Sequence, residues 1–281
     1  MNIRGMPRAL SILGAILCAL LIIDNVNAQN PDLPSWNDGA AKQAIITFVN
    51  KVTNKSGTGY VAPQDRIATF DQDGTLWVEQ PLYAQAAFAL DRIHVLAQQH
   101  PEWTKRQPFK AVLTNDRKAI GKFSESDWAM VLAATHAGMS NEAFQQIVKD
   151  WLAQVRDSRF HRPYTDLVYQ PMLELMHFLR ANGFRTYIVT WGGQEFVRVY
   201  SERVYGVPPE QVVGSSILTQ YQYQNGKPIL MREPKVFFVD DHGGKPVGIN
   251  LFMVSVPSRL SVIRPATSRC LNGPRQAMAH D

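Results

Sequence analysis

The sequence predicts an α/β protein whose parallel sheet is interrupted by a long helical insert. Three short apolar runs, at 67–70, 184–190 and 236–239, have the length and composition of buried strands. The segments between them repeat their apolar residues at helical spacing, and the stretch from Leu82 to about Arg162 shows no alternating strand pattern. Strands separated by helices are typical of a parallel sheet. With 281 residues, 45% of them hydrophobic and 19% charged, the chain is neither disordered, collagen-like nor disulfide-dense.

The N-terminus has the pattern of a secretory signal peptide. Arg4 and Arg8 precede an apolar run at 9–23, and Ala28 ends a group of small residues suited to cleavage before Gln29. The apolar run is about 15 residues long, whereas a membrane-spanning helix needs about 20. We therefore expect residues 1–28 to direct export across the inner membrane, to the periplasm; an uncleaved membrane anchor is the alternative.

Helical patterns flank the first predicted strand. Apolar residues between 41 and 52 share one helical face before it. The insert that follows is predicted to be helical, with the clearest patterns at 86–98, 127–136 and 142–155. Pro171 is suited to the first turn of a further helix, which Asn182-Gly183 would end.

The remaining elements follow the second predicted strand. Trp191-Gly192-Gly193 is predicted to end that strand, and the pattern over 194–205 predicts one helix. Asn225-Gly226 is a strong signal for a two-residue hairpin turn. The apolar run at 236–239 then predicts another strand of the sheet.

The excess of basic residues is concentrated at the two ends of the chain. The protein has 29 Lys+Arg against 24 Asp+Glu, a net charge of +5. Residues 1–28 carry +1 and residues 254–281 carry +3, which leaves +1 for the 225 residues between them. A nearly neutral body gives no reason to expect a nucleic-acid partner.

Two carboxylates follow the first strand at the edge where α/β proteins place their sites. Asp71 and Asp73 lie two residues apart in Phe70-Asp71-Gln72-Asp73-Gly74-Thr75-Leu76. This spacing suits phosphoryl transfer, in which one carboxylate attacks phosphorus and the other exchanges protons with the leaving group and with water. Gly74 permits a tight turn whose backbone N–H groups can hold phosphate oxygens. A calcium loop and a plain Asx turn are the alternatives, but Leu76-Trp77-Val78 supplies no further calcium ligands.

The chain resembles the haloacid-dehalogenase-like hydrolase superfamily, and within it the exported phosphoserine-phosphatase-like members. The resemblance extends from about Trp36 to Asn250 and rests on three motifs, at 69–77, 188–193 and 244–249. It implies a Rossmann-like parallel sheet with a helical cap inserted after the first catalytic strand. The presence of Asp73 favours phosphoester cleavage, because displacing halide requires no proton for the leaving group.

The resemblance also implies roles for individual residues. Asp71 would be the nucleophile, Asp73 the general acid/base, Thr190 a hydroxyl donor to the phosphoryl oxygens and Lys245 the neutralising cation. The carboxylate of Asp71 and the backbone carbonyl of Asp73 would bind Mg²⁺. The predicted phosphate-binding residues are Gly74, Thr75, Gly192 and Gly193.

These roles imply a domain organisation and a function. The core is predicted at 29–80 and 168–253 and the cap at 81–167, and the expected substrate is a small phosphorylated molecule. The predicted function is Mg²⁺-dependent hydrolysis of a phosphate monoester through an aspartyl-phosphate, with phosphoryl transfer to a second alcohol as a weaker alternative. The histidines, His136 among them, lack ligand spacing and are predicted to be surface or packed side chains.

Two features depart from the family pattern. Trp191 stands where relatives usually carry glycine. More seriously, an acidic loop resembling Gly-Asn-Ser-x-Gly-Asp should follow the lysine and complete the metal site, yet residues 254–280 contain no acidic residue. Asp240 or Asp241 is the alternative third metal ligand. Without one, the chain would be a catalytically impaired or inactive member of the family.

The genetic code offers an explanation for the missing motif. If one nucleotide is lost near Met253, each original codon consists of the third base of one present codon and the first two bases of the next. The pairs from Leu260/Ser261 to Ala266/Thr267 then permit Phe-Gly-Asn-Ser-x-Gly-Asp, the absent motif in its expected place. Residues 254–281 are therefore predicted to be an out-of-frame tail, with a genuine divergent C-terminus as the alternative.

Overall fold

The computed structural model describes residues 33–253 and 261–262. The predicted signal segment at 1–28 and, apart from Ser261 and Val262, the predicted out-of-frame tail at 254–281 lie outside the described residues. Cleavage after Ala28 thus stays a prediction, which N-terminal sequencing of exported protein tests. Within the described part of the chain, no helix combines the length and the apolar character needed to cross a membrane.

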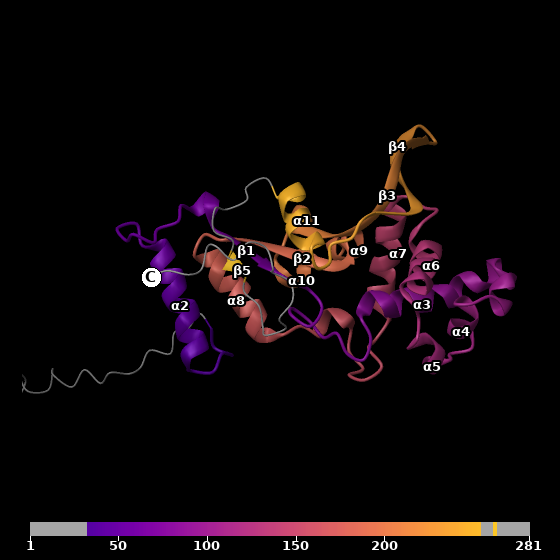
Figure 1. Cartoon of the computed structure of the whole chain (residues 1–281), viewed down its shortest axis with the longest axis horizontal. Coiled ribbons are helices and arrows are strands. Elements are labelled where there is room, and N and C mark those ends of the chain that lie inside the picture. Colours follow the sequence, from indigo (N-terminus) through magenta and orange to yellow (C-terminus); the bar gives the residue numbers. More distant parts are fainter. Residues whose placement is uncertain (1–32, 254–260, 263–281) are drawn as a thin grey trace, which may run out of the picture.

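The predicted α/β class is confirmed by a five-stranded, mostly parallel sheet in the order β4-β3-β2-β1-β5 (Figure 1). Strands β1 (Ile67–Phe70), β2 (Arg185–Gly193), β3 (Val212–Gln224) and β5 (Ser261–Val262) are joined by parallel pairings. Strand β4 (Lys227–Phe238) pairs with β3 in the antiparallel sense. The described β5 pairs with β1 through two residues only, Ala68 and Thr69.

The insert between β1 and β2 is helical, as its sequence pattern predicts. It lies to one side of the sheet in Figure 1, and its longer helices are close to the predicted ranges. The helices are α3 (Ala84–Leu96), α4 (Phe109–Leu113), α5 (Arg117–Ile120), α6 (Glu125–His136) and α7 (Asn141–Gln154), with short 3₁₀ turns at Ala97–Gln99, Pro101–Lys105 and Tyr164–Asp166. Ser124 and Asp127 form a reciprocal capping box that fixes the start of α6.

The remaining helices lie around the sheet, outside the insert. Pro171 lies in the first turn of α8, and Gly183 after it has a φ of +77°, so both predicted boundary signals are confirmed. The helices are α2 (Ala40–Thr53), α8 (Gln170–Ala181), α9 (Gln194–Arg198), α10 (Ser201–Tyr205) and α11 (Gly244–Phe252), with 3₁₀ turns at Pro63–Asp65 and Pro209–Gln211.

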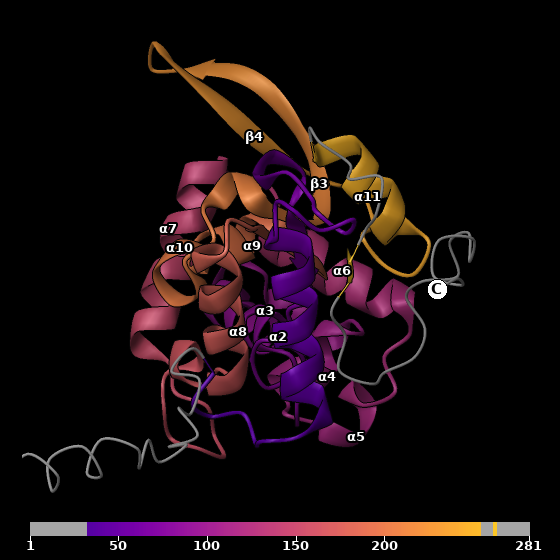
Figure 2. The same ribbon diagram turned by 90° about the vertical axis from the view of Figure 1, so that its left-hand side faces the viewer.

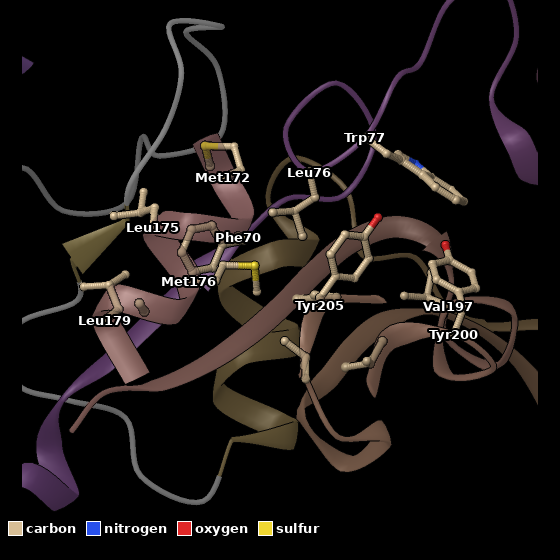
Figure 3. Packing of buried hydrophobic residues seen from close by; sticks show 14 of the residues in the cluster. Phe70, Leu76, Trp77, Met172, Leu175, Met176, Leu179, Val197, Tyr200 and Tyr205 are labelled. Atoms are coloured by element: carbon tan, nitrogen blue, oxygen red, sulfur yellow. The ribbon is translucent and has the colours of Figure 1, made fainter. Parts of the chain in front are cut away.

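Alternate residues of the strands face two different helical layers. Phe70 and Ile188 belong to the main core, which α8 covers with Leu175, Met176 and Leu179 (Figure 3). On the opposite face a smaller cluster packs against α11, which lies on the other side of the sheet from α2 and α8 (Figure 2): Ile67, Tyr187, Val189, Val213, Ile249 and Met253. Burial on both faces explains why the strands are apolar runs rather than alternating ones.

Three predictions about the second half of the chain were wrong in detail. The region 194–205 forms α9 and α10 rather than one helix, and β2 continues through Gly193 with a register shift after Thr190 rather than ending at Trp191. The run at 236–239 is not a separate strand, because residues up to Phe238 continue β4 past two register shifts in its pairing with β3.

The hairpin formed by β3 and β4 reaches the helical insert. Its turn is the predicted one, with positive φ at both Asn225 (51°) and Gly226 (75°). From β4, the Arg232 N–H donates to Met139 O at 2.9 Å, and Arg232 Nε donates to His136 O at 2.7 Å. The hairpin thus ties the second half of the chain to the insert, which begins beside the carboxyl end of β1.

Candidate active site

The loop after β1 holds two carboxylates at the carboxyl edge of the parallel sheet. The carbonyl of Gln72 accepts the N–H groups of Thr75 and Leu76, at 3.2 and 2.8 Å, and closes the turn. Gly74 has a φ of +71°, and a Cβ at this position would lie 2.6 Å from Glu79 Oε2. The left-handed backbone conformation therefore favours glycine there, and a larger residue would also displace the Glu79 side chain.

Lys245 forms an ion pair with Asp71. Its Nζ lies 2.9 Å from Asp71 Oδ1, and its side chain is 9% exposed against 41% for Asp71. Lys245 Nζ also donates to Val189 O at 3.2 Å, and the Gln72 N–H donates to Asp71 Oδ1 at 2.9 Å. The contacts of the described residues therefore fix Oδ1 and leave Oδ2 as the oxygen available to a ligand.

Asp73 is held in a different environment. Trp77 Nε1 donates to Asp73 Oδ1 at 2.7 Å, and the Trp77 ring is buried and stacked on Tyr200 at 5.0 Å. Burial raises the pKa of Asp73 to about 6; the charges of Asp71 and Glu79 add to the rise, while the Trp77 hydrogen bond opposes it. A carboxyl group with this pKa can both donate and accept a proton near neutral pH.

The end of β2 brings Thr190 and two glycines to the same place. Thr190 is buried, and its Oγ1 accepts the Gly192 N–H at 3.0 Å. A Cβ at Gly192 would lie 3.9 Å from Asp73 Oδ2, so the β2 loop directly adjoins the β1 loop. The four predicted catalytic residues therefore lie on neighbouring elements, with Asp71 and Lys245 in direct contact.

The predicted phosphate-binding residues lie in these same two loops, but their backbone N–H groups have protein partners. The Gly74 N–H donates to Trp77 O at 2.9 Å, and the Thr75, Gly192 and Gly193 N–H groups likewise donate to protein oxygens. In this structure the four N–H groups shape the loops. Their role as phosphate ligands stays a prediction.

A glutamine from the insert contacts the β2 loop, and sequence reasoning missed it. Gln85 Oε1 accepts the Gly193 N–H at 2.7 Å, and Gln85 Nε2 lies 3.0 Å from His136 Nε2. The other ring nitrogen of His136 lies 2.7 Å from Thr135 Oγ1, whose own proton goes to Val131 O. This network places the imidazole proton on Nδ1 and orients the Gln85 amide. No pattern in the sequence signals a contact between residues so far apart in the chain.

His136 is packed, as the sequence predicts, and is held neutral. Burial lowers its pKa to about 3, and the charges of Arg232 and Arg92 add to the effect. In the unfolded chain the imidazole takes up a proton near the ordinary histidine pKa of about 6.5. The stability that the neutral side chain contributes is therefore present above pH 6.5 and is lost as the pH falls toward 3.

We expect His136→Gln to weaken the acid sensitivity of folding. Glutamine carries no titratable group and keeps an acceptor for Gln85. The free energy of unfolding of the wild-type chain should fall by about 1 kcal/mol for each pH unit below pH 6.5, and that of the variant should not show this fall. Urea unfolding at pH 7.5 and 5.5 measures the difference. His94 is exposed, so His94→Gln is the matched control and should keep the wild-type dependence. Equal pH dependence in all three proteins would contradict the assignment.

The alternative third metal ligands, Asp240 and Asp241, differ in their surroundings. Asp240 is fully buried, and neither of its carboxylate oxygens has a hydrogen-bond partner among the described residues. Burial raises its pKa to about 7, while the charge of Lys245 opposes the rise. Asp241 is more exposed and pairs with His242 at 2.8 Å. Across residues 33–253 and 261–262, no three His, Cys, Asp or Glu residues are grouped to hold a metal ion.

Solved structures are similar to the chain at low sequence identity. A conserved, functionally unknown protein from Anaerococcus prevotii DSM 20548 is 14% identical over 80% of this chain and 78% of its own, with a TM-score of 0.50. A protein of unknown function from Bordetella pertussis Tohama I is 16% identical, over 66% of this chain and 72% of its own, with a TM-score of 0.41. A phosphoserine phosphohydrolase-like protein from Francisella tularensis subsp. tularensis SCHU S4 is 14% identical, over 66% and 71%, with a TM-score of 0.31. At 14% identity, the likeness to the Anaerococcus prevotii protein concerns the fold alone.

The sequence comparisons give a family. No curated protein sequence matches the chain. One protein family, described as haloacid dehalogenase-like hydrolase, matches residues 68–245, a range that begins in β1 and ends at Lys245. The match covers more than half of the chain and includes both loop carboxylates, Thr190 and the lysine that pairs with Asp71. The protein belongs to the haloacid dehalogenase-like hydrolases.

Proposed function

We propose that this hydrolase is a Mg²⁺-dependent phosphatase that cleaves a small phosphate monoester through an aspartyl-phosphate on Asp71. The ion pair between Asp71 and Lys245, with Asp73 two residues away, is the observation that carries the proposal. This arrangement supports the proposed roles of Asp71 as nucleophile, Lys245 as fixed cation and Asp73 as proton donor.

The residues present fit Mg²⁺. Carboxylate and carbonyl oxygens are its preferred ligands, and it is commonly bound by one or two carboxylates together with waters and substrate phosphate. Asp71 Oδ2 and the backbone carbonyl of Asp73 are the proposed ligands, with Asp240 or Asp241 as alternatives for the third. The ion would neutralise charge on the phosphate.

The chain's own groups supply two steps. A carboxylate oxygen of Asp71 attacks phosphorus, and the bond to the leaving oxygen breaks as Asp73 donates its proton to that oxygen. Asp73, now ionised, takes a proton from water, whose oxygen attacks the phosphorus of the aspartyl-phosphate and restores Asp71. Lys245 and the Thr190 hydroxyl stabilise the negative charge of the phosphoryl group in both steps.

Asp73→Asn tests this mechanism because its effect should depend on the leaving group. In the first turnover, release of the alcohol from an alkyl phosphate should slow about 10³-fold, since an alkoxide requires protonation. The burst of p-nitrophenolate from p-nitrophenyl phosphate should slow much less, by about tenfold, since p-nitrophenolate leaves without a proton. Later turnovers of both esters should be slow, because the aspartyl-phosphate then lacks the base that activates water. Rapid mixing with Mg²⁺ and with EDTA measures the first turnover of both esters. Equal losses for the two esters in that turnover, or full activity in EDTA, would contradict the proposal.

We also propose that the reading frame is shifted after Met253 and that activity is impaired in consequence. The missing acidic loop and the codon pairs that permit it support this proposal. So does the outer face of α11, where Val247, Leu251 and Phe252 are exposed. Apolar side chains that gather at the surface indicate a missing partner. The DNA sequence across Met253 is the direct test.

A further inference from the structure

Two aromatic side chains lie together beside the loops of the candidate active site. Tyr83 immediately precedes α3 of the insert, and Trp191 immediately follows Thr190 on β2. Their ring centroids are 5.9 Å apart, with an angle of 64° between the planes. Tyr83 is 39% exposed and Trp191 47% exposed, so both rings present open surface. We call this pair the aromatic rim.

The aromatic rim adjoins the catalytic carboxylates. Burial raises the pKa of Tyr83, and the charges of Glu79, Asp73 and Asp71 raise it further. On the other side of the rim, Gly192 follows Trp191 and approaches Asp73 Oδ2. A group bonded to a phosphate held beside Asp71 and Lys245 would meet these rings on the side of the insert.

The edge-to-face geometry leaves ring surface for a third ring. Aromatic pairs prefer edge-to-face or offset-stacked contacts, so a planar group can pack against the open surface of one or both rings. Single exposed aromatic residues are common and need no explanation. This pair differs because it joins the insert to the catalytic loop at the place where a substrate's leaving group would lie.

The charges at the aromatic rim disfavour an anionic leaving group. The Glu79 carboxylate lies against the β1 loop, with Oε2 2.6 Å from the position of a Cβ on Gly74, and after burial its charge is the largest contribution that raises the pKa of Tyr83. A carboxylate on the leaving group would be repelled by this charge. The nearby Gln85 amide is already hydrogen-bonded to Gly193 and His136. It therefore orients the β2 loop rather than forming hydrogen bonds with a polar group of the substrate.

We propose that the aromatic rim of Tyr83 and Trp191 binds the leaving group, and that the substrates are phosphate monoesters whose leaving group carries a planar, uncharged ring. This inference rests on the proposed phosphatase function, since it assumes that a phosphoryl group occupies the site beside Asp71 and Lys245. Trp191 and Tyr83 are then specificity-determining residues rather than catalytic ones.

Binding of non-hydrolysable phosphonates to the full chain in Mg²⁺ tests the proposal without requiring turnover. Calorimetry compares phenylphosphonate with cyclohexylphosphonate, which has a similar apolar size but no planar ring, and with the carboxylated 3-phosphonopropionate. We expect phenylphosphonate to bind about three- to tenfold more tightly than cyclohexylphosphonate. The carboxylated compound should bind most weakly of the three.

The variants separate the aromatic rim from the phosphate site. Trp191→Gly and Tyr83→Ala should remove the preference for the planar ring while methylphosphonate binds as before, and Trp191→Phe should keep part of it. Both rings are half-exposed, so the variants should keep the wild-type melting temperature. Tyr221→Ala, an exposed tyrosine on the distant hairpin, is the matched control and should keep the full preference.

The outcomes distinguish the two proposals. Equal binding of the planar and non-planar phosphonates would overturn the proposal that the aromatic rim binds the leaving group. A preference that survives both Trp191→Gly and Tyr83→Ala would do the same. Neither result would contradict the proposed phosphatase function. Failure of all the phosphonates to bind, methylphosphonate included, would overturn the proposed phosphate site and with it the inference that depends on it.

Discussion

Asp71→Asn should reduce phosphatase activity by about 10⁴-fold or to the detection limit. The amide is nearly isosteric with the carboxylate and keeps an oxygen for Lys245 Nζ, which lies 2.9 Å from Oδ1 in the wild-type chain. It cannot form an aspartyl-phosphate, however, because an amide is a very weak nucleophile toward phosphorus. The chemical step is therefore removed while the geometry of the site is largely kept.

Two measurements separate a lost nucleophile from a damaged site. Asp71→Asn should bind inorganic phosphate at least as tightly as the wild-type chain, since it removes a negative charge beside the anion. Lys245 is buried and would lose its charged partner, so a modest fall in melting temperature is expected. Asp65→Asn, at an exposed position, is the control and should change neither activity nor binding. Retained turnover in Asp71→Asn would exclude the covalent mechanism.

The parts of the fold that the sequence predicts are those determined by interactions between residues close together in the chain. The buried strand at 67–70, the helix between Pro171 and Gly183 and the turn at Asn225-Gly226 each depend on a few adjacent residues. The run at 236–239 shows the limit of this reasoning. Its apolar residues fit a strand, but its direction and its continuity with β4 depend on pairing with β3, and no local pattern encodes a pairing partner.

The residues of the candidate site also differ in whether the sequence could predict them. Asp71 and Asp73 could be singled out because they are adjacent to a buried strand and closely spaced. The Trp77 hydrogen bond to Asp73 lies within the same motif, yet its presence depends on the fold of the turn. Gln85 could not be found, because its contact with Gly193 forms only when the insert docks on the sheet. The sequence thus indicates the groups that react more readily than those that orient them.

Restoring one nucleotide near Met253 should raise both the activity and the stability of the protein. The restored frame would supply the acidic loop beside Asp71, and we expect kcat/KM to rise about 10²-fold or more. It would also supply a segment to cover the outer face of α11. Burying the exposed parts of Val247, Leu251 and Phe252 should add roughly 3 kcal/mol to the free energy of unfolding.

A second repaired protein, with asparagine in place of the restored aspartate, separates these two effects. It should gain the stability, because the apolar face is covered, but not the activity, because a metal ligand is missing. Urea unfolding and phosphate release, measured on the existing chain and both repaired chains, give the comparison. If repair changes neither quantity, residues 254–281 are a genuine C-terminus and the third ligand must be sought at Asp240 or Asp241. Asp240 is then the stronger candidate, because its buried carboxylate has no hydrogen-bond partner in the described part of the chain and an ion would supply one.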